Sequence, residues 1–281
     1  AANSFDALLT RPDVDFVISF LNRGGFLNSE MFAPLLSQYH DIPFLGGTPI
    51  VRGVSDDKHL MKRIAQALGV RTPDWQHLPR GGFLAGEPAD RSAEAFIVKP
   101  NASSASWGIK VTGSWQEALD HTALLQAAGH DAIVESWIEG YDLAVPVIGS
   151  ITPWYLPVVR YEYDGGLRSY EQKRDLVTGR EGHQILEPSR LTSEVLRLSD
   201  LLLREIWPFD HGRFEFRVDA HTGEIHFIEV NLNCNLWSRK TIAIAARHVG
   251  LTHAELLETI VCHSLHRQSL LEVQQAPERA A

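Results

Sequence analysis

The sequence predicts a mixed α+β or α/β protein with more than one lobe, and three observations support this fold class. An apolar strand, a helix and a second apolar strand follow one another between residues 15 and 47. Strands and helices then alternate, and a hairpin of alternating polar and apolar residues precedes two closing helices. The 281 residues are enough for about two domains.

The composition is that of an ordinary soluble globular protein. The chain is 44% apolar and 22% charged, and its formal net charge of −9 is spread along the sequence. Since Lys and Arg form no long cluster and no apolar run reaches about 20 residues, neither a nucleic-acid partner nor a membrane is expected. Two cysteines and the absence of a signal-peptide pattern predict a cytoplasmic protein without disulfides.

A β-α-β unit is predicted at the start of the chain. DFVISFL (15–21) and IPFLGG (42–47) have the apolar character of short buried strands, and SEMFAPLLSQY (29–39) between them has a helical pattern. A helical crossover of this kind favours parallel pairing of the two strands.

The next segment, SDDKHLMKRIAQALGV (55–70), predicts a single helix. Ser55 is the expected N-terminal cap, and the two aspartates that follow it suit the positive end of the helix dipole. Leu60, Ile64 and Leu68 recur at helical spacing and form the expected apolar stripe.

The rest of the chain alternates predicted loops, strands and helices. Gly and Pro mark a loop at 79–94, the polar segment 164–190 is expected to be irregular, and the tail is expected to be disordered. The further predicted strands are 95–100, 109–113, 131–138, 142–149 and 155–163, and the further predicted helices are 114–129, 193–207, 239–250 and 252–268.

The predicted hairpin, RFEFRVDAHTGEIHFIEVN (213–231), carries polar groups at unusual places. Alternate residues of a strand share one face, so the charged residues of RFEFRVD lie together, opposite its apolar ones. A turn centred on the sequence HTG places Glu215 opposite Glu229 and Arg213 opposite Asn231.

Two explanations of this pairing remain open from the hairpin alone. Like charges directly opposed across a sheet are destabilising, and a hard divalent cation such as Mg²⁺, which prefers oxygen ligands, would balance Glu215 and Glu229. The other explanation is a solvated hairpin face on which Arg213 and Arg217 pair with the acids.

Two further motifs are weaker signals when taken singly. KPNASSASWG (99–108) places Lys99 at a strand end before small hydroxyl residues, a pattern that can cradle phosphate but is also typical of a flexible loop. In IVESWIEGYD, Glu135 can meet a purine edge while Trp137 and Ile138 supply apolar walls. The alternative for Trp137 is a place in the core.

In this order, the motifs resemble the ATP-grasp superfamily, and most closely its D-alanine–D-alanine ligase branch, from about Val14 to Gln268. The resemblance implies a fold of three lobes, with ATP held between the central and C-terminal α+β lobes, and Mg²⁺, or Mn²⁺ in its place, as the metal. The implied lobes are 1–54 (N-terminal), 55–141 (central) and 142–268 (C-terminal, with the metal-binding hairpin), and 269–281 is a tail.

The resemblance also implies roles for individual residues. Glu215, Glu229 and Asn231 match the metal ligands, and Arg213 matches an arginine that stabilises negative charge on the acyl oxygens. Lys173 matches a third phosphate-contacting lysine with a catalytic role. The residues matched to ATP are Lys58, Lys99, Ser104, Ser106, Glu135, Trp137, Ile138, Asp142 (at the ribose) and Ile228.

Departures from the family pattern cluster on the substrate side. Lys240 and Thr241 stand where the D-alanine enzymes have a Ser-Leu pair, and Arg174 stands where they have a tyrosine. Lys240 and Arg174 would add positive charge, which favours an anionic substrate. The N-terminal strand, turn and helix of the family are also not matched, so either upstream residues are missing from this sequence or the lobe is reduced.

The activity implied is that of a cytoplasmic ATP-dependent carboxylate–amine ligase, which forms an amide through an acyl phosphate. Small-molecule carboxylates and amines are the expected partners, in particular amino acids other than two D-alanines, and a homodimer is expected only by analogy. Two alternatives remain: a D-alanine–D-alanine ligase of cell-wall synthesis with a divergent pocket, and a nucleotide-binding protein without catalysis.

Overall fold

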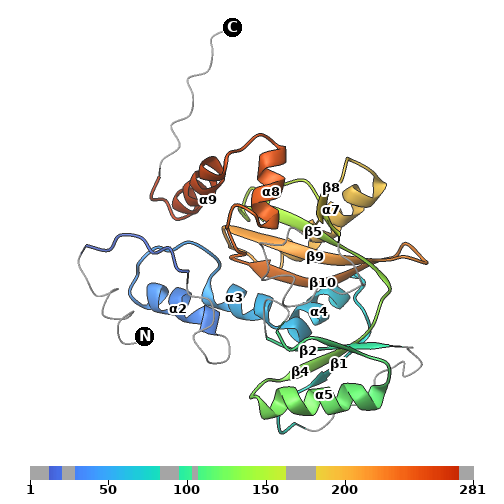
Figure 1. The fold of residues 1–281 in the computed structure, drawn as a ribbon. Helices are drawn as coiled ribbons and strands as arrows, with labels where there is room; N and C mark the ends of the chain where they lie inside the picture. The colour runs from blue at the N-terminus through green and yellow to red at the C-terminus, as the bar shows by residue number, and fades with distance from the viewer. Residues whose placement is uncertain (1–12, 21–28, 83–94, 103–106, 163–181, 272–281) are drawn as a thin grey trace.

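The computed structural model describes residues 13–20, 29–82, 95–102, 107–162 and 182–271. Within these ranges the framework is a pair of antiparallel sheets, which Figure 1 shows one above the other with helices packed against them. This mixed architecture confirms the predicted fold class. Across the same ranges, none of the helices combines the length and the apolar character needed to cross a membrane.

The N-terminal region is more helical than predicted. The predicted helix is confirmed as the 3₁₀ turn η1 (Ser29–Met31) and α2 (Phe32–Tyr39). In the described residues the two predicted strands reduce to one parallel bridge between Val17 and Phe44. The prediction of a buried first strand is wrong: Phe20 is 84% exposed, because a bridge of this length builds no sheet that could cover it.

The segment predicted as one helix over 55–70 forms two helices. These are α3 (Pro49–Asp56) and α4 (Lys58–Ala67), and Asp57 between them has an extended backbone. The Asp57 side chain accepts a hydrogen bond from the backbone N–H of Leu60 at 2.8 Å and so caps α4. The prediction of Ser55 as the cap is therefore wrong, since Ser55 lies inside α3.

The inward face of α4 also differs from the predicted stripe. Leu60 is 45% exposed, whereas Lys58, Met61, Lys62 and Ala65 are buried. Two lysines four positions apart share one face of a helix, and here that face points into the protein. The helix therefore presents charge, as well as hydrocarbon, to the interior.

The smaller sheet has the strand order β1-β4-β2-β3. Its strands are β1 (Trp75–Leu78), β2 (Phe96–Pro100), β3 (Lys110–Thr112) and β4 (Ala132–Ser136). Helix α5 (Trp115–Ala127) begins after Ser114, whose side chain accepts from the Glu117 N–H, and packs on this sheet around Val98 and Val134. The predicted strands and helix of this region are confirmed within a few residues.

The larger sheet has the order β10-β9-β5-β7-β8, and β6 pairs with β5. Its strands are β5 (Gly140–Ile148), β6 (Trp154–Tyr155), β7 (Val159–Glu162), β8 (Gly182–Ile185), β9 (His211–Asp219) and β10 (Ile225–Leu232). Strand β8 corrects the prediction that 164–190 is irregular, because it pairs with β7 from Val159↔Ile185 to Glu162↔Gly182.

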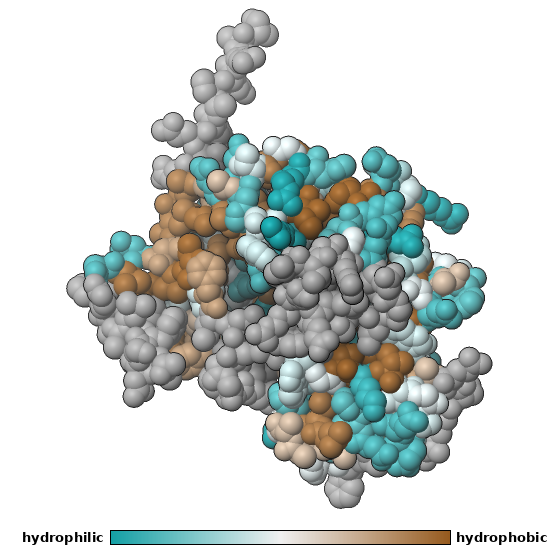
Figure 2. Space-filling view, in the orientation of Figure 1, coloured by the Kyte–Doolittle hydropathy of each residue, from teal (hydrophilic) through white to brown (hydrophobic). Residues whose placement is uncertain are grey.

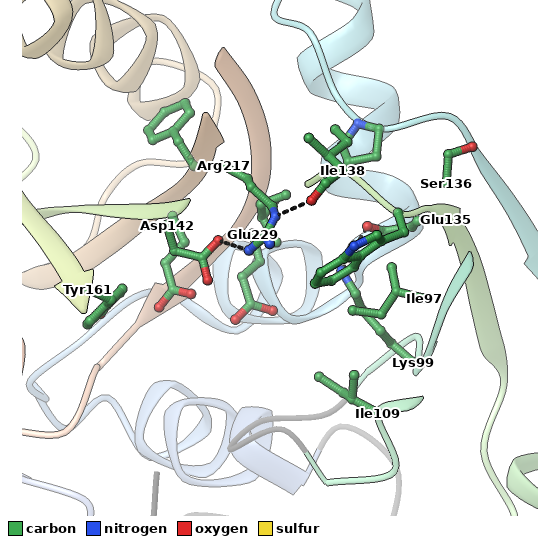
Figure 3. Close-up of a pocket in the computed structure, with 15 residues that line it drawn as sticks. Ile97, Lys99, Ile109, Glu135, Ser136, Ile138, Asp142, Tyr161, Arg217 and Glu229 are labelled. Carbon is green, nitrogen blue, oxygen red and sulfur yellow. Dashed lines mark hydrogen bonds and ion pairs between the residues drawn. The ribbon is translucent and has the colours of Figure 1, made fainter. Parts of the chain in front are cut away.

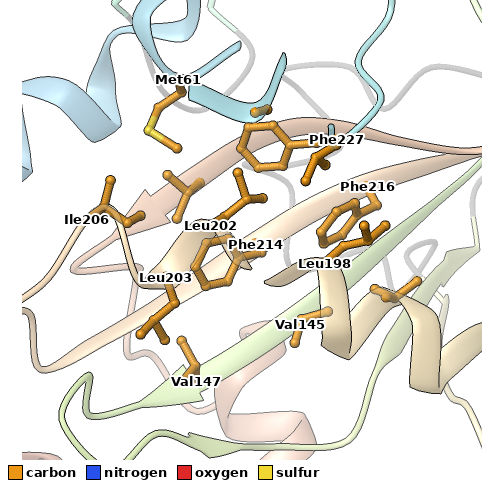
Figure 4. Packing of buried hydrophobic residues seen from close by; sticks show 14 of the residues in the cluster. Met61, Val145, Val147, Leu198, Leu202, Leu203, Ile206, Phe214, Phe216 and Phe227 are labelled. Atoms are coloured by element: carbon orange, nitrogen blue, oxygen red, sulfur yellow. The ribbon is translucent and has the colours of Figure 1, made fainter. Parts of the chain in front are cut away.

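Helices cover both faces of the larger sheet. Helix α7 (Arg190–Leu203) starts after a Ser189–Thr192 capping box, three residues before the predicted start, and ends four before the predicted end. Its leucines pack with Phe214, Phe216 and Phe227 (Figure 4), and each such buried side chain contributes roughly 1.5–3 kcal/mol.

The two predicted closing helices are confirmed as α8 (Thr241–His248) and α9 (His253–Arg267), and they lie on the opposite face. Figure 2 shows an apolar surface area beside α9, and hydrophilic residues interspersed over the rest of the described part of this view.

Candidate functional site

A cleft open to solvent lies between the two sheets, and both apolar and charged side chains line it, as is typical of small-molecule sites. Figure 3 shows its lining coming from both sheets and from the segment that joins β4 to β5. Among the predicted site residues, Lys99, Glu135, Trp137, Ile138, Asp142, Glu215, Ile228 and Glu229 line it. The further lining residues are Pro73, Ile97, Ile109, Ser136, Tyr161, Phe216 and Arg217.

One wall of the cleft contains a buried cluster of three charged residues, two of which line the cleft. The Glu135 carboxylate is 2.7 Å from the Lys99 Nζ and 3.4 Å from the Lys62 Nζ. Burial alone would raise the pKa of Glu135, but the two lysines hold it below its usual value. Burial also lowers the pKa of Lys62 to about 8. We refer to Lys62, Glu135 and Lys99 as the buried cluster.

The prediction from sequence missed Lys62. The missed signal is its spacing of four from Lys58, which places both lysines on one face of α4. The two lysines nevertheless serve different acids, since Lys58 Nζ lies 3.2 Å from Glu229 and Lys62 lies at Glu135.

The hairpin register is confirmed. Glu215 lies opposite Glu229, and Arg213 lies opposite Asn231. The Asn231 amide nitrogen lies 3.1 Å from Glu229 Oε1 and 3.3 Å from Glu215 Oε1, so it bridges the two carboxylates. These contacts join Asn231 to the two acids, which line the cleft.

Cations flank both of these acids. Arg213 donates from Nε to Glu215 Oε1 at 2.8 Å, and Lys58 pairs with Glu229. The side chains of Glu215 and Glu229 are 13% and 20% exposed. The ion pair Arg213–Glu215 is what a solvated hairpin face would show, but these acids line a cleft and are mostly covered. We refer to Glu215, Glu229 and Asn231, with Arg213 and Lys58, as the hairpin cluster.

A β-bulge lies between Phe227 and Glu229 in β10. In a regular strand, Ile228 and Glu229 would point to opposite faces, yet both line the cleft. The extra residue in the bulge changes the alternation at this point. It therefore adds an apolar wall beside an acid, an effect that the residue pattern alone did not reveal.

The donor set of the hairpin cluster fits a hard divalent cation. Two carboxylates and an amide converge on one another, and carboxylate and amide oxygens are ligands that Mg²⁺ accepts while keeping some of its waters. Within the described ranges, groups of three or more His, Cys, Asp or Glu side chains suited to a metal are absent, at the hairpin as well, where two acids lie together. A cation at the hairpin would therefore need the Asn231 amide as its third protein ligand.

The other predicted site residues are placed as follows. Asp142 forms an ion pair with Arg217 at 2.7 Å. Lys240 is the residue before α8, outside the lining of the cleft, and the next residue, Thr241, lies 3.0 Å from the hydroxyl of Tyr161. Ser104, Ser106, Lys173 and Arg174 lie outside the described residues.

Two buried groups near this end are held in their neutral forms. Burial lowers the pKa of His211 to about 4 and raises the pKa of the Cys234 thiol to about 11. A thiol with so high a pKa is a poor nucleophile at neutral pH. Neither Cys234 nor His211 is therefore expected to act as a nucleophile or a base at neutral pH.

Comparison with known families finds a match over most of the chain. The family model described as "D-ala D-ala ligase C-terminus" matches residues 64–262, which is more than half of the chain.

Two proteins of similar sequence are named D-alanine–D-alanine ligases. The D-alanine–D-alanine ligase of Aquifex aeolicus is 28% identical over 221 residues, which span 79% of this chain and 73% of that protein. The D-alanine–D-alanine ligase A of Bacillus cereus is 22% identical over 261 residues, which span 92% of this chain and 84% of that protein.

Solved structures show the same fold. The crystal structure of a Bacillus anthracis D-alanine–D-alanine ligase complexed with ATP has a TM-score of 0.77 at 19% identity, covering 94% of this chain and 84% of that one. The VanG D-Ala:D-Ser ligase of Enterococcus faecalis has a TM-score of 0.71 at 18% identity, covering 89% of this chain and 73% of that one.

Proposed function

This chain belongs to the D-ala D-ala ligase family, and from that premise we propose that it is an ATP-dependent ligase that joins a carboxylate to an amine. The observation that carries the proposal is the pairing of Glu215 with Glu229 at one end of the cleft between the sheets. Apolar walls and the buried cluster occupy the rest of that cleft, as a nucleotide with a charged triphosphate would require.

In the proposed reaction, an oxygen of the substrate carboxylate attacks the γ-phosphorus of ATP, and ADP leaves. The amine then attacks the carbonyl carbon of the acyl phosphate and loses a proton, and phosphate leaves with the electron pair of the broken C–O bond. Proximity and charge neutralisation supply most of such a rate enhancement. This agrees with a site whose described residues offer cations and no activated nucleophile.

The residues of the chain divide this work along the cleft. Lys58 and Lys99, with Lys173 and the hydroxyls of Ser104 and Ser106, would contact the phosphates. Arg213 would face the acyl oxygens and stabilise the negative charge that develops there.

At the nucleoside end, Glu135, Trp137, Ile138 and Ile228 would hold the adenine, and Asp142 would bind the ribose. Mg²⁺, or Mn²⁺ in its place, would be held by Glu215, Glu229 and Asn231 and would neutralise charge on the phosphates.

We propose substrates other than two D-alanines. Lys240 precedes α8 next to Thr241, and with Arg174 it would add positive charge for an anionic amino acid. Proteins of this fold are named for different second amino acids, D-alanine in one and D-serine in another, so the fold is compatible with a changed acceptor.

D-alanine–D-alanine ligation is the second candidate, and the names of the similar proteins favour it. The lobe boundaries at 1–54, 55–141 and 142–268, the tail at 269–281 and a homodimer remain predictions.

A screen of the purified protein tests the function. Phosphate release would be measured with ATP and Mg²⁺ over D- and L-amino acids, dicarboxylic amino acids and small carboxylates, singly and in pairs. We expect turnover that needs both a carboxylate and an amine, with an anionic amino acid preferred. Robust turnover with D-alanine alone would reject the altered specificity and leave the ligase activity standing. Thermal stabilisation by ATP and Mg²⁺ without any hydrolysis would favour a non-catalytic protein.

A further inference from the structure

Arg217 lies in the cleft, but nothing in the proposed reaction uses it. It sits on β9 two residues beyond Glu215 and four beyond Arg213, so the three side chains share one face of the strand. Arg217 is 5% exposed and lines the cleft. A buried guanidinium needs partners that offset the cost of removing it from water.

Arg217 contacts both the segment that joins the two sheets and the first residues of β5. Its Nε donates to the backbone oxygen of Ile138 at 2.6 Å, and a terminal nitrogen donates to Asp142 at 2.7 Å. A further donor reaches the oxygen of Gly140 at 3.2 Å. The guanidinium also lies over the Trp137 ring, 4.4 Å from its centroid. Figure 3 shows the contacts with Ile138 and Asp142.

The segment does not depend on Arg217 for its attachment to the sheet. Strands β5 and β9 pair continuously from Gly140↔Asp219 to Ile148↔His211. A Cβ atom at Gly140 would lie 1.9 Å from the backbone oxygen of Val218, so the two backbones already meet at the closest possible distance. For the stability of this contact between β5 and β9, an apolar side chain at position 217 would be as good as a buried ion pair.

What Arg217 does add is a fixed arrangement of cleft-lining groups. It holds the Asp142 carboxylate, the Ile138 carbonyl and the Trp137 ring at once, and the planar guanidinium fork fixes their relative positions. Alternate residues of a strand are roughly 7 Å apart, so β9 presents Arg213, Glu215 and Arg217 at even intervals along the cleft. The positions run from the proposed acyl end to the nucleoside end.

We propose that Arg217 is a positioning residue for the nucleoside end of the cleft, holding Asp142 and the 137–138 segment in the arrangement that receives ribose and base. The proposal rests on the proposed function, since it assumes a bound nucleotide. It assigns Arg217 a task separate from phosphate binding, so its removal should weaken binding of the nucleoside part and leave the chemical step intact.

The test compares ATP with 2′-deoxy-ATP, each with Mg²⁺, by titration calorimetry and by steady-state kinetics. For Arg217→Met we expect ATP affinity to fall by on the order of tenfold, because charge-assisted hydrogen bonds that order Asp142 are lost. The preference for ATP over 2′-deoxy-ATP should shrink toward that of Asp142→Asn. The Michaelis constant for ATP should rise while kcat changes little.

Two further variants sharpen the test. Arg217→Lys keeps the positive charge but lacks the planar guanidinium group. Its ATP affinity and its preference for ATP over 2′-deoxy-ATP should lie between those of the wild type and of Arg217→Met. Arg160→Met is the matched control, because Arg160 also stacks on an aromatic ring, that of Tyr141 at 4.0 Å, but lies outside the cleft lining. It should leave the ATP preference unchanged. If Arg217→Met fails to fold, Arg217→Lys and Asp142→Asn carry the comparison.

The outcomes separate this inference from the proposed function. A wild-type protein that does not bind ATP with Mg²⁺ rejects both. A wild-type protein that binds ATP, with Arg217 variants of unchanged affinity and ribose preference, rejects the positioning role and leaves the ligase proposal standing. A loss of thermal stability without a change in the ribose preference likewise overturns the inference, because a purely structural arginine predicts that result.

Discussion

The two charged clusters of the cleft differ in burial and in the balance of their charges. In the buried cluster, two lysines share Glu135, which is 1% exposed, and the Lys62 side chain is 0% exposed. In the hairpin cluster, two carboxylates meet one amide, each with its own cation, and Glu215 and Glu229 keep 13% and 20% exposure. Both clusters border the cleft, but the side chains of the buried cluster are almost fully covered, whereas the two acids of the hairpin cluster keep more of their surface exposed.

The difference separates a fixed part of the site from an exchangeable part. Charges that are fully enclosed must keep their partners, because an unpaired buried charge costs several kcal/mol. Carboxylates that reach the cleft can exchange Arg213 or Lys58 for a cation that enters with a ligand. We therefore expect changes in the buried cluster to affect stability first, and changes in the hairpin cluster to affect activity first.

The largest effect on stability is expected from Glu135→Gln. The substitution keeps the shape of the side chain but leaves Lys62 and Lys99 without their counter-charge. Breaking a buried pair of this kind lowers the free energy of unfolding by about 3–5 kcal/mol. Urea denaturation followed by circular dichroism measures the loss. A loss of unfolding free energy no larger than that expected for an exposed ion pair, about 0.3–0.5 kcal/mol, would show that water reaches the buried cluster.

The largest effect on activity is expected from Glu229→Gln. Loss of one carboxylate from the proposed metal site should lower turnover by on the order of a hundredfold or more, since even indirect partners of metal sites are worth about 10–100-fold. The free energy of unfolding should fall by less than in Glu135→Gln, because Glu229 is 20% exposed and pairs with the single lysine Lys58, whereas Glu135 pairs with two lysines. Glu224→Gln at the far end of the same hairpin, where Glu224 pairs with Arg71, is the matched control. Equal activity in the two variants would reject the assignment.

Lys62 should give the buried cluster its own pH dependence. Its pKa is lowered by burial from 10.5 to about 8, so between these values the unfolded chain binds more protons than the folded one. The contribution of Lys62 to the free energy of unfolding should therefore rise as the pH rises from about 8 to about 10.5. Unfolding measured at intervals over this range, in the wild type and in Lys62→Met, should give a difference that changes in this direction. A flat difference would mean that Lys62 titrates normally.

The smallest effect is expected from an exposed ion pair. Asp200 lies in the last turn of α7, and Arg204 follows the last residue of that helix. A terminal guanidinium nitrogen of Arg204 lies 2.6 Å from the Asp200 carboxylate, and the arginine side chain is 70% exposed. Arg204→Met should change the free energy of unfolding by only about 0.3–0.5 kcal/mol. Glu135→Gln and Arg204→Met each break an ion pair, one buried and one exposed. The ratio of their losses in unfolding free energy therefore measures how much burial adds to the cost of breaking the pair.

The hairpin shows how much of the site could be predicted from the sequence. A period of two fixes which side chains share a face, and the predicted pairs Glu215–Glu229 and Arg213–Asn231 are found. The turn alone does not give them, because the register beside the turn, where His226 pairs with Arg217, would place Ile228 opposite Glu215 until the bulge shifts it by one residue. The bulge at Ile228 could not be predicted in this way, because it arises where one strand has an extra residue relative to its partner. Strands β2, β3 and β4 and helix α5 of the smaller sheet were predicted within a few residues, since turn residues bound their apolar runs, whereas strand β1 was not predicted.

Helix α4 shows where the sequence was insufficient. Its apolar stripe predicted that Leu60 faces inward, but what a helix buries depends on the surfaces that it meets. Here those surfaces carry Glu135 and Glu229, so Lys58 and Lys62 are buried and Leu60 is exposed. Strand β8 was missed for a related reason, because its pairing with β7 is not visible in its own short, polar sequence.

The central claim is that the cleft between the sheets binds ATP with a divalent cation held by the hairpin cluster. Titration calorimetry of ATP in the presence and absence of Mg²⁺, on the wild type and on a Glu215→Gln, Glu229→Gln double variant, tests it most directly. We predict saturable binding by the folded wild type that strengthens with Mg²⁺, and loss of the Mg²⁺ dependence in the folded double variant. Absence of binding, or binding that is indifferent to Mg²⁺ in both proteins, would contradict the claim.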